Sequence, residues 1–458
     1  MDKEEPQQTN EKLLRILAFT LAITLMSATM FNLVLPEITI ELQLSLTQAS
    51  WITSGFLLVY AIGTVMYGKL ADHFKLKHLL TFGFTVFTVG SLIGLFAHAF
   101  WLVLLGRILQ AVGAAVVPAA ASIIPIRYFS PDKRGRAMGI AMTGLAIGSA
   151  IGPIVASLVV SILHWRWLFC MPLLILLTLP YYRKYLQEDE KKAGSMDWIG
   201  GGLLAGMLAL LLLAITKGEW LLLVACVILL FLFIIRIHFT KEPFVQPQIF
   251  RNKAYSIGLS LAFFVTAAGY SLPFLSPQLL FHLHHLPQEA VGFAMVPAAV
   301  LSAIFGRKGG KLADVKGNAY LFFVASGLLG SCFLLMSLFT DISPLLIVLF
   351  LILGNLGQTF MMIALSHTLS RTLPQEQIGV GMGFLSMMNF IAGAVSAGVY
   401  SRVVDHGMQA QWLPMPMNPD TYVYSNIYVV LLVIHVSILV VHYFQFRERT
   451  MKHEYTAN

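Results

Sequence analysis

Charged residues are scarce in this chain of 458 residues, at 11%, against roughly 25% in soluble domains. Hydrophobic residues make up 57% of the chain. The apolar runs are about 18–25 residues long, which is the length at which a helix crosses a hydrocarbon core of ~30 Å. The runs lack the polar–apolar alternation of a membrane β-barrel. We therefore expect an all-α integral membrane protein.

Cysteine is also scarce. Cys170, Cys226 and Cys332 all lie in apolar runs, and an odd number of such residues favours packing over a disulfide framework. The sequence contains neither the glycine-rich phosphate-binding pattern GxxxxGK[ST] nor the zinc-protease pattern HExxH. These absences give no support to ATP-driven transport or intramembrane proteolysis. We expect a protein that is not an enzyme and has no cofactor.

Hydropathy predicts about fourteen membrane spans, each helical because backbone polar groups in lipid must be paired within the span. Their expected ranges are 13–35, 51–68, 79–97, 102–126, 137–160, 165–181, 198–216, 220–238, 254–275, 289–306, 319–340, 345–368, 379–404 and 425–446.

Basic residues decide the orientation. Of the 30 lysines and arginines, all but Arg107, Arg166, Lys217 and Arg402 fall on the inside if the N-terminus is inside. Cytoplasmic loops carry such an excess. We therefore expect a multi-pass protein of the cell membrane with both termini in the cytoplasm. The net charge of +8 is explained by these loops, so nucleic acid is not an expected partner.

An internal repeat predicts the organisation. Gly68-Lys69-Leu70-Ala71-Asp72 recurs as Gly310-Lys311-Leu312-Ala313-Asp314, after the second and tenth spans. Both copies should face the same side, so the two halves are parallel repeats, which suits alternating access around a central site. The expected parts are a cytoplasmic N-terminus (1–12), a six-helix half (13–181), a linker with an inserted, removable helix pair (182–253), a second six-helix half (254–446) and a cytoplasmic tail (447–458).

The repeated loop is a candidate conformational latch. Asp72 would be favoured near a helix N-terminus, where backbone N–H groups attract a carboxylate, and Arg136 is its candidate ion-pair partner. The alternative is purely structural: basic residues at a cytoplasmic helix end, with glycines that let helices approach. The residues assigned to the latch are Gly68, Asp72, Lys75, Arg136, Gly310 and Asp314.

Arg107 is the basic residue within a span. An arginine in the bilayer interior costs at least ~2.5–3.5 kcal/mol, which favours a role in a wet cavity, in pairing or in binding. The alternative is that its side chain reaches the nearby helix end. Gln110 shares its helix face. Three further polar residues within spans, Asn32, His367 and Asn389, would line a cavity or bond neighbouring helices.

Small residues form a stripe on the fifth span. Gly144, Gly148 and Gly152 are spaced by four residues and Pro153 follows, so another helix can approach closely there and a kink is permitted. The stripe is a packing surface or an interface that slides during transport. Three histidines, His282, His284 and His285, share a loop, where a solvated role is favoured over a metal site.

Several motifs together resemble the major facilitator superfamily. Gly68–Asp72 resembles its loop between spans two and three, Gly106-Arg107-x-x-Gln110 resembles its span-four motif, and Gly148-x-x-x-Gly152-Pro153 resembles the span-five motif typical of its exporters. Trp165-Arg166-Trp167 fits the start of span six in the fourteen-span drug:proton antiporter branch. Length and loop pattern resemble the tetracycline-efflux proteins of Gram-positive bacteria.

The resemblance implies proton-coupled efflux of amphipathic small molecules. Tetracycline exporters of this type carry acidic residues within spans one, five and thirteen, whereas this chain has acids only at the ends of its spans, such as Glu37, Asp197 and Asp405. This absence predicts neutral, zwitterionic or anionic substrates, with proton coupling through an end-placed carboxylate or His367. The alternatives are a metabolite transporter of the same fold and a non-transporting sensor or adaptor.

Overall fold

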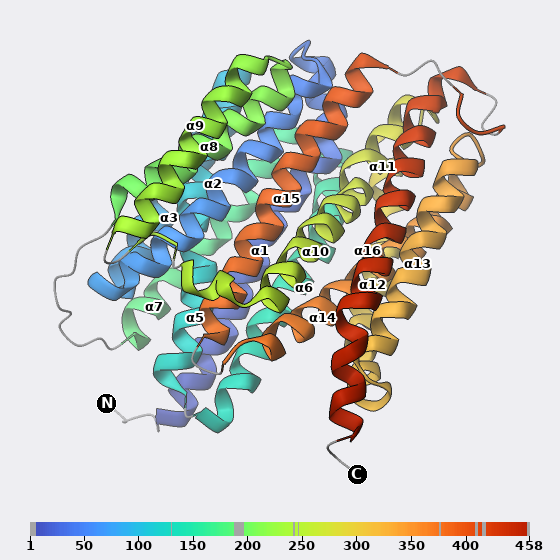
Figure 1. Ribbon diagram of the computed structural model, residues 1–458. Helices are drawn as coiled ribbons and strands as arrows, with labels where there is room; N and C mark the ends of the chain where they lie inside the picture. Colours follow the sequence, from blue (N-terminus) through green and yellow to red (C-terminus); the bar gives the residue numbers. More distant parts are fainter. Residues whose placement is uncertain are drawn as a thin grey trace. The chain divides into compact units, whose positions relative to one another are not determined.

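The computed structural model describes residues 6–129, 131–186, 197–240, 243–245, 247–374, 377–407, 411–414 and 418–455. Within these ranges the regular elements are all helices, and none is a strand (Figure 1). For some helical residues, among them Asp72, Arg136, Gly310 and Asp314, only the backbone is described. The fold class expected from the sequence, an all-α chain, is therefore confirmed for the described residues.

The chain divides into two compact units, which we describe separately. Unit 1 comprises Met1–Pro247, Pro287–Phe293 and Ala397–Arg402, and unit 2 comprises Gln248–Leu286, Ala294–Ser396 and Val403–Asn458. The helices within 1–247 are α1 (Pro6–Glu41), α2 (Leu46–His73), α3 (Leu76–Leu95), α4 (Phe100–Ala114), α5 (Val116–Tyr128), α6 (Pro131–Ile162), η1 (Trp165–Phe169), η2 (Met171–Thr178), α7 (Leu179–Tyr185), α8 (Trp198–Lys217) and α9 (Trp220–Phe239).

The remaining elements lie mainly in unit 2. They are η3 (Pro247–Arg251), α10 (Lys253–Gly269), α11 (Ser271–His282), α12 (Gln288–Lys316), α13 (Asn318–Leu338), α14 (Pro344–Thr372), α15 (Ile378–His406), η4 (Pro419–Thr421) and α16 (Tyr422–Tyr455). Helix α13 packs closely on α14, because a Cβ on Gly357 would lie 2.8 Å from the backbone nitrogen of Leu329. On its other side, Phe322 of α13 stacks on His442 of α16 with ring centroids 3.5 Å apart.

Local sequence signals explain where helices begin. Ser45 precedes α2, where its Oγ accepts a hydrogen bond from the Gln48 N–H at 3.1 Å and its own N–H donates to Gln48 Oε1 at 2.9 Å. This reciprocal pair satisfies two N–H groups that the first turn leaves without helical partners. Asn252 caps α10 in a similar way, with Oδ1 accepting from the N–H groups of Ala254 and Tyr255.

Thirteen described helical stretches are long and apolar enough to cross a membrane. The remaining expected span, the tenth (289–306), coincides with the shorter apolar stretch Ala290–Gly306 of α12, so a count of fourteen stays a prediction. The sixth span differs from the expected helix, because its first part consists of the 3-10 helices η1 and η2 and only its end, α7, is α-helical. Pro172 and Pro180 there each remove a backbone donor.

Glycines bring helices of unit 1 into close contact. On α3 and α4, a Cβ on Gly90 would lie 2.6 Å from the Gly106 carbonyl oxygen, and one on Gly113 would lie 2.3 Å from the Gly83 carbonyl oxygen. These separations are shorter than any real Cβ contact, so the two backbones are as close as the sequence permits. This contact fixes the position of α4, which carries Arg107.

Candidate functional site

Arg107 lies on α4 with its side chain fully buried inside unit 1. Its Nη1 donates to the Ser27 carbonyl oxygen at 3.1 Å and to Gln110 Oε1 at 2.9 Å, and its Nε donates to the Ile52 carbonyl oxygen at 3.3 Å. The side chain is therefore held among α1, α2 and α4. The alternative in which it reaches the helix end is wrong for this structure, and the side chain does not face open space.

Aromatic rings complete the surroundings of the guanidinium. The Arg107 Cζ atom lies 4.2 Å from the ring centroid of Phe31 and 4.0 Å from that of Phe56. Such cation–π contacts are strongest where water is excluded. Gln110, whose Oε1 accepts from Arg107, donates through Nε2 to Ser91 Oγ of α3 at 2.8 Å. We call Ser27, Phe31, Phe56, Arg107 and Gln110 the arginine centre.

The arginine centre joins three helices, α1, α2 and α4, around one fixed positive charge, and Gln110 links it to α3. The hydrogen bonds described for its guanidinium go to carbonyl, amide and hydroxyl oxygens, which offset part of the cost of burying the charge. Such a centre favours negative or strongly dipolar groups nearby. Asn32, which follows Phe31 on α1, is also buried, at 2% exposed.

The two candidates in unit 2 have different surroundings. Asn389 of α15 accepts through Oδ1 a hydrogen bond from Thr266 Oγ1 of α10 at 2.9 Å, so it links neighbouring helices. His367 of α14 is half-buried, and its Nδ1 has no hydrogen-bond partner among the residues that the structure describes. The ring of His367 therefore has a nitrogen with no described bond, whereas the side-chain oxygen of Asn389 is already bonded.

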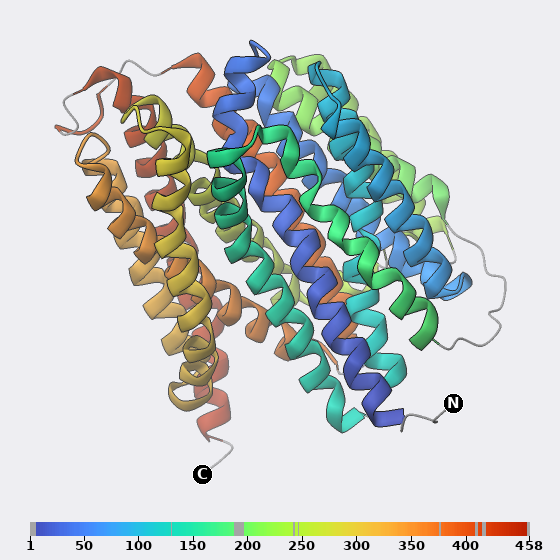
Figure 2. The same ribbon diagram turned by 180° about the vertical axis from the view of Figure 1, so that it is seen from behind.

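The glycine stripe of α6 faces α1. A Cβ on Gly144 would lie 2.2 Å from the Ala18 carbonyl oxygen, one on Gly148 would lie 2.3 Å from the Ala22 carbonyl oxygen, and one on Gly152 would lie 2.1 Å from Thr29 Oγ1. The two helices run side by side (Figure 2). Pro153 lies inside α6 directly after the stripe. The stripe is thus a helix interface.

The latch loop is described only in part. Gly68 is half-buried with open space around its Cβ position, and Lys75 immediately precedes α3. The backbone places Gly68–Asp72 at the end of α2 and Gly310–Asp314 within α12, so both copies of the motif are helical and not loops as the sequence predicted. The side chains of Asp72, Arg136 and Asp314, and the surroundings of Gly310, lie outside what the structure describes, so their roles stay a prediction.

The neighbouring Lys69 has a contact that the sequence did not suggest. Its Nζ donates to the Pro243 carbonyl oxygen and lies 5.3 Å from the ring centroid of Phe244. Pro243 and Phe244 follow the inserted helices α8 and α9 in the chain. The lysine of the loop motif therefore holds the segment that leaves the inserted helix pair.

Asp197 anchors the same segment. This buried residue caps α8, with Oδ1 accepting from the Gly200 N–H and from Arg236 Nε, both at 3.0 Å, and Oδ2 accepting from the Phe244 N–H at 3.2 Å. Burial by itself raises the pKa of the Asp197 carboxyl, but these hydrogen bonds outweigh burial and hold the pKa below its usual value. Lys69, Asp197, Arg236, Pro243 and Phe244 form what we call the hairpin clasp.

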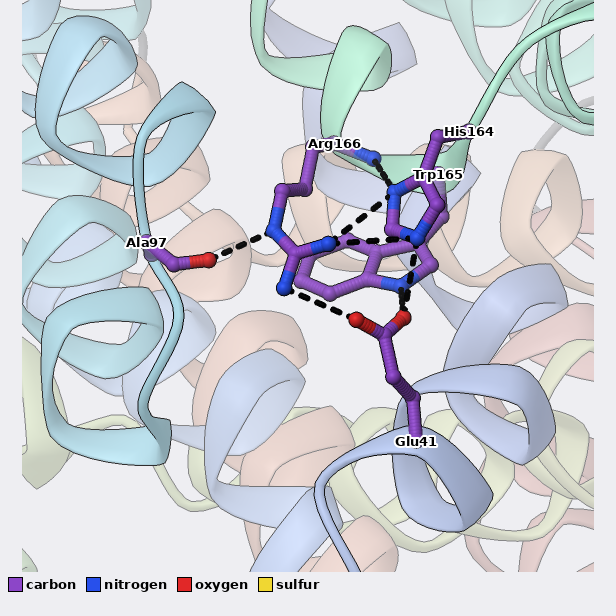
Figure 3. A network of polar contacts seen from close by, with 5 residues as sticks. All are labelled: Glu41, Ala97, His164, Trp165 and Arg166. Atoms are coloured by element: carbon purple, nitrogen blue, oxygen red, sulfur yellow. Dashed lines mark hydrogen bonds and ion pairs between the residues drawn. The ribbon is translucent and has the colours of Figure 1, made fainter.

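A second network missed by the sequence joins α1 to η1 (Figure 3). Glu41 Oε1 lies 2.8 Å from Arg166 Nη2, and Oε2 lies 3.0 Å from His164 Nε2 and accepts from Trp165 Nε1 at 2.5 Å. Arg166 Nε also donates to the Ala97 carbonyl oxygen at 2.5 Å. The sequence offered one signal, Arg166, which is an isolated basic residue in a segment predicted to lie outside.

Gln278 is a buried polar residue of unit 2 that the sequence motifs did not indicate. Gln278 of α11 is fully buried, and neither Oε1 nor Nε2 has a hydrogen-bond partner among the described residues. Buried side-chain amides are bonded in most structures. The sequence offered a weak signal, since Gln278 is a polar residue in an apolar run close to Pro277.

Comparisons with known proteins agree with this architecture. The family model for the Major Facilitator Superfamily matches residues 17–397. The riboflavin transporter RibZ of Clostridioides difficile is 23% identical over 84% of this chain and 86% of its own length. The methylenomycin A resistance protein of Bacillus subtilis is 24% identical over 75% of each chain. Multidrug resistance protein 3 of Bacillus subtilis is 25% identical over 58% of this chain and 54% of its own length.

Solved structures share the fold at low identity. A POT family transporter in complex with a thioalcohol conjugated peptide superposes with a TM-score of 0.69 at 15% identity, over 96% of this chain and 96% of that chain. A bacterial homologue of the lysosomal transporter Spinster, in an inward-facing form, gives 0.66 at 14% identity, over 96% and 97%. With the family model matching most of its length, this multi-pass membrane chain belongs to the Major Facilitator Superfamily, a family of transporters.

Proposed function

We propose that this protein is a secondary transporter that exports amphipathic small molecules in exchange for protons, by alternating access. The observation that carries the proposal is the contact of Gly144, Gly148 and Gly152 with α1. These glycines include the motif that is typical of exporters in the family. Their positions against Ala18, Ala22 and Thr29 support a motif that builds one continuous helix interface.

The names of two relatives point the same way. The methylenomycin A resistance protein and multidrug resistance protein 3 are named for resistance, and efflux is one route to resistance. Their identity to this chain is 24% and 25%, which is too low to transfer a substrate. The efflux direction therefore rests on the glycine interface together with these names.

The arginine centre supports a preference for neutral, zwitterionic or anionic substrates over permanent cations. Arg107 is fully buried and is held by carbonyl and amide oxygens within a span. A permanent cation brought near this charge would be repelled in a medium of low dielectric constant. A substrate with a carboxylate or a polarised carbonyl would instead be attracted.

Proton coupling is assigned to carboxylates at span ends or to His367. Glu41 joins Glu37 and Asp405 as a candidate, because it lies beside His164 and Arg166 and is only partly exposed, at 33%. Asp197 becomes a weaker candidate, since its carboxylate already accepts from Arg236 and two backbone N–H groups. Its bonds fit a structural anchor.

Inverted membrane vesicles with an acidic lumen test the proposal. Uptake of a neutral or zwitterionic drug should depend on the pH gradient and stop when an ionophore collapses it. A permanently cationic dye of similar size should be taken up poorly. The panel includes Glu37→Gln, Glu41→Gln, Asp405→Asn and His367→Ala. Gradient-driven uptake of the cation that survives all four changes would contradict both the charge preference and the proton assignment.

The proposed interface is tested by Gly148→Leu. The added side chain has no room against Ala22, and overpacking of this kind costs about 1–3 kcal/mol, so folding or transport should fail. Gly202→Leu on α8 is the matched control, because Gly202 is exposed and nothing lies within 4 Å of its Cβ position. Equal transport by both variants would remove the observation on which the proposal rests.

A metabolite transporter is the second candidate function. The riboflavin transporter RibZ aligns with a larger share of this chain than either resistance protein does. The same vesicles would be loaded with riboflavin and with drugs, and a clear preference for the flavin would favour this candidate. No flux of any solute under a pH gradient would favour a sensor or adaptor.

The latch and the topology complete the proposal. Asp72→Asn should slow turnover while leaving expression and ligand binding intact, and the same change at Asp314 asks whether the second copy is used.

Single cysteines at Lys75 and Lys316 should react only with reagents on the cytoplasmic side of cells. Labelling of either position from outside would contradict the parallel repeats and the cytoplasmic termini.

A further inference from the structure

An apolar groove runs along one face of α2 in unit 1, with a cavity volume of about 490 Å³. Helices α2, α3, α4 and α8 provide its walls. Its floor contains Ile62, Tyr67 and Leu79, which are buried, and its rim contains Phe74, Phe82 and Trp198, which are more than half exposed. The volume lies in the range of roughly 300–1,000 Å³ that is usual for small-molecule sites.

The groove has the length of one membrane leaflet. Its α2 residues extend from Val59 to Leu70, which at 1.5 Å per residue is about 17 Å. Half of a hydrocarbon core is about 15 Å thick. The length of the groove thus matches one leaflet of the hydrocarbon core, and its wall helices α2, α3, α4 and α8 are long and apolar enough to cross a membrane.

One end of the groove has the residues of a membrane interface. Trp198, at the start of α8 and 58% exposed, is of the aromatic type that gathers at headgroup level. Lys75 and Lys77 follow Phe74 directly and are both partly exposed. In the segment 68–78 three lysines stand against one aspartate, so the charge at this end favours an anionic group.

We propose that the groove binds one acyl chain of an anionic phospholipid, with its phosphate at Lys75 and Lys77. The apolar walls take the chain and the lysines select the headgroup, as basic clusters beside membrane helices do. Ala205 of α8 lines the groove, so the inserted helices form part of the site. The proposal does not depend on the transported substrate or on proton coupling.

Native mass spectrometry of the purified full-length protein tests the site. Phosphatidylglycerol and phosphatidylcholine with identical acyl chains are added, and the lipid retained on delipidation is counted. The wild type should retain phosphatidylglycerol in preference. The double change Lys75→Gln/Lys77→Gln should lower that preference by about tenfold. Lys217→Gln, at the opposite end of α8, is the charge control and should have no effect.

A second variant tests the groove itself. Ala205→Phe fills the wall and should reduce retention of both lipids, whereas Val224→Phe on α9, 45% exposed and outside the groove, should not. Melting temperatures in detergent verify that both variants fold. Equal retention of the two lipids by the wild type, or unchanged retention by Ala205→Phe, would overturn the proposal. Ala205→Phe altering efflux of a lipophilic dye with lipid retention unchanged would assign the groove to a solute instead.

Discussion

Two fully buried glutamines, one in each unit, have opposite surroundings. Gln110 of α4 accepts a hydrogen bond from Arg107 and donates one to Ser91. Gln278 of α11 has neither amide atom bonded to any residue that the structure describes. A buried polar group without a partner costs about 1–3 kcal/mol. Burial alone therefore does not reveal the role of a polar residue, since the first glutamine is a structural link and the second is a polar group available for a new partner.

The largest effect is expected from removing the charge that Gln110 helps to hold. Arg107→Ala should abolish transport, because four described hydrogen bonds and two cation–π contacts are lost together. Arg107→Lys should restore little, since lysine lacks the planar fork of donors. Vesicle transport at matched expression is the measurement. Full activity of the alanine variant would show that the arginine centre only packs.

The next effect compares the bonded glutamine with an apolar residue of similar shape. Gln110→Met should lower the melting temperature of the purified protein, since the charge-assisted bond to Arg107 is worth about 1.5–3 kcal/mol and Ser91 also loses its partner. Ser91→Ala is the companion variant. It removes only the hydrogen bond between Gln110 and Ser91, so it should lower the melting temperature by less. A melting temperature equal to that of the wild type would mean that the amide is not a link.

The same change in unit 2 should have the opposite sign. Gln278→Met removes an amide that has no described partner, so the melting temperature should stay constant or rise. The corresponding gain in the free energy of unfolding would be at most about 1–3 kcal/mol. If Gln278 bonds a substrate or another helix in a different state of the cycle, transport should fall while stability rises. A clear loss of stability would show that the Gln278 amide is a structural link like that of Gln110, and the two glutamines would then not differ.

The smallest effect is expected at Asp197, a buried polar residue whose bonds were also missed. Its pKa is lowered in the folded state, so the ionised carboxylate adds stability above the unfolded-state pKa of about 3.9, and this stability is lost as pH falls through the lower folded-state pKa. Asp197→Asn should cost on the order of 1 kcal/mol near neutral pH, because Arg236 is partly exposed.

Melting curves between pH 3 and pH 7 would measure this dependence. The difference between wild type and Asp197→Asn should shrink as the pH falls below about 4. The exposed Asp420 provides the control, and Asp420→Asn should leave the curve unchanged. A difference that stays constant with pH would mean that shape, and not charge, makes Asp197 important.

The sequence predicted what depends on neighbours along the chain. Hydropathy located thirteen helical spans, and the spacing of Arg107 and Gln110 placed them on one helix face, where they form a hydrogen bond. The glycine spacing on α6 predicted a close helix contact, and α1 makes it. These properties are local because one helix period governs them.

Properties that depend on distant residues were missed. Asp197 and Arg236 are 39 positions apart, and Glu41 and Trp165 are 124 apart, so no short pattern joins them. The lack of described partners around Gln278 depends on which side chains other helices present. The 3-10 helices in the sixth span also escaped, because hydropathy measures how apolar a segment is and not how tightly it winds.

The hairpin clasp has a consequence for attempts to shorten the protein. The sequence predicts that α8 and α9 form a removable insertion, but Lys69 donates to Pro243, and Asp197 binds Arg236 and Phe244. A chain engineered without α8 and α9 would lose Arg236, the ion-pair partner of Asp197, and with it part of the anchor that keeps Phe244 beside Lys69. A workable derivative without this helix pair would need a substitute for that anchor, so the helix pair and the motif around Lys69 should be redesigned as one unit.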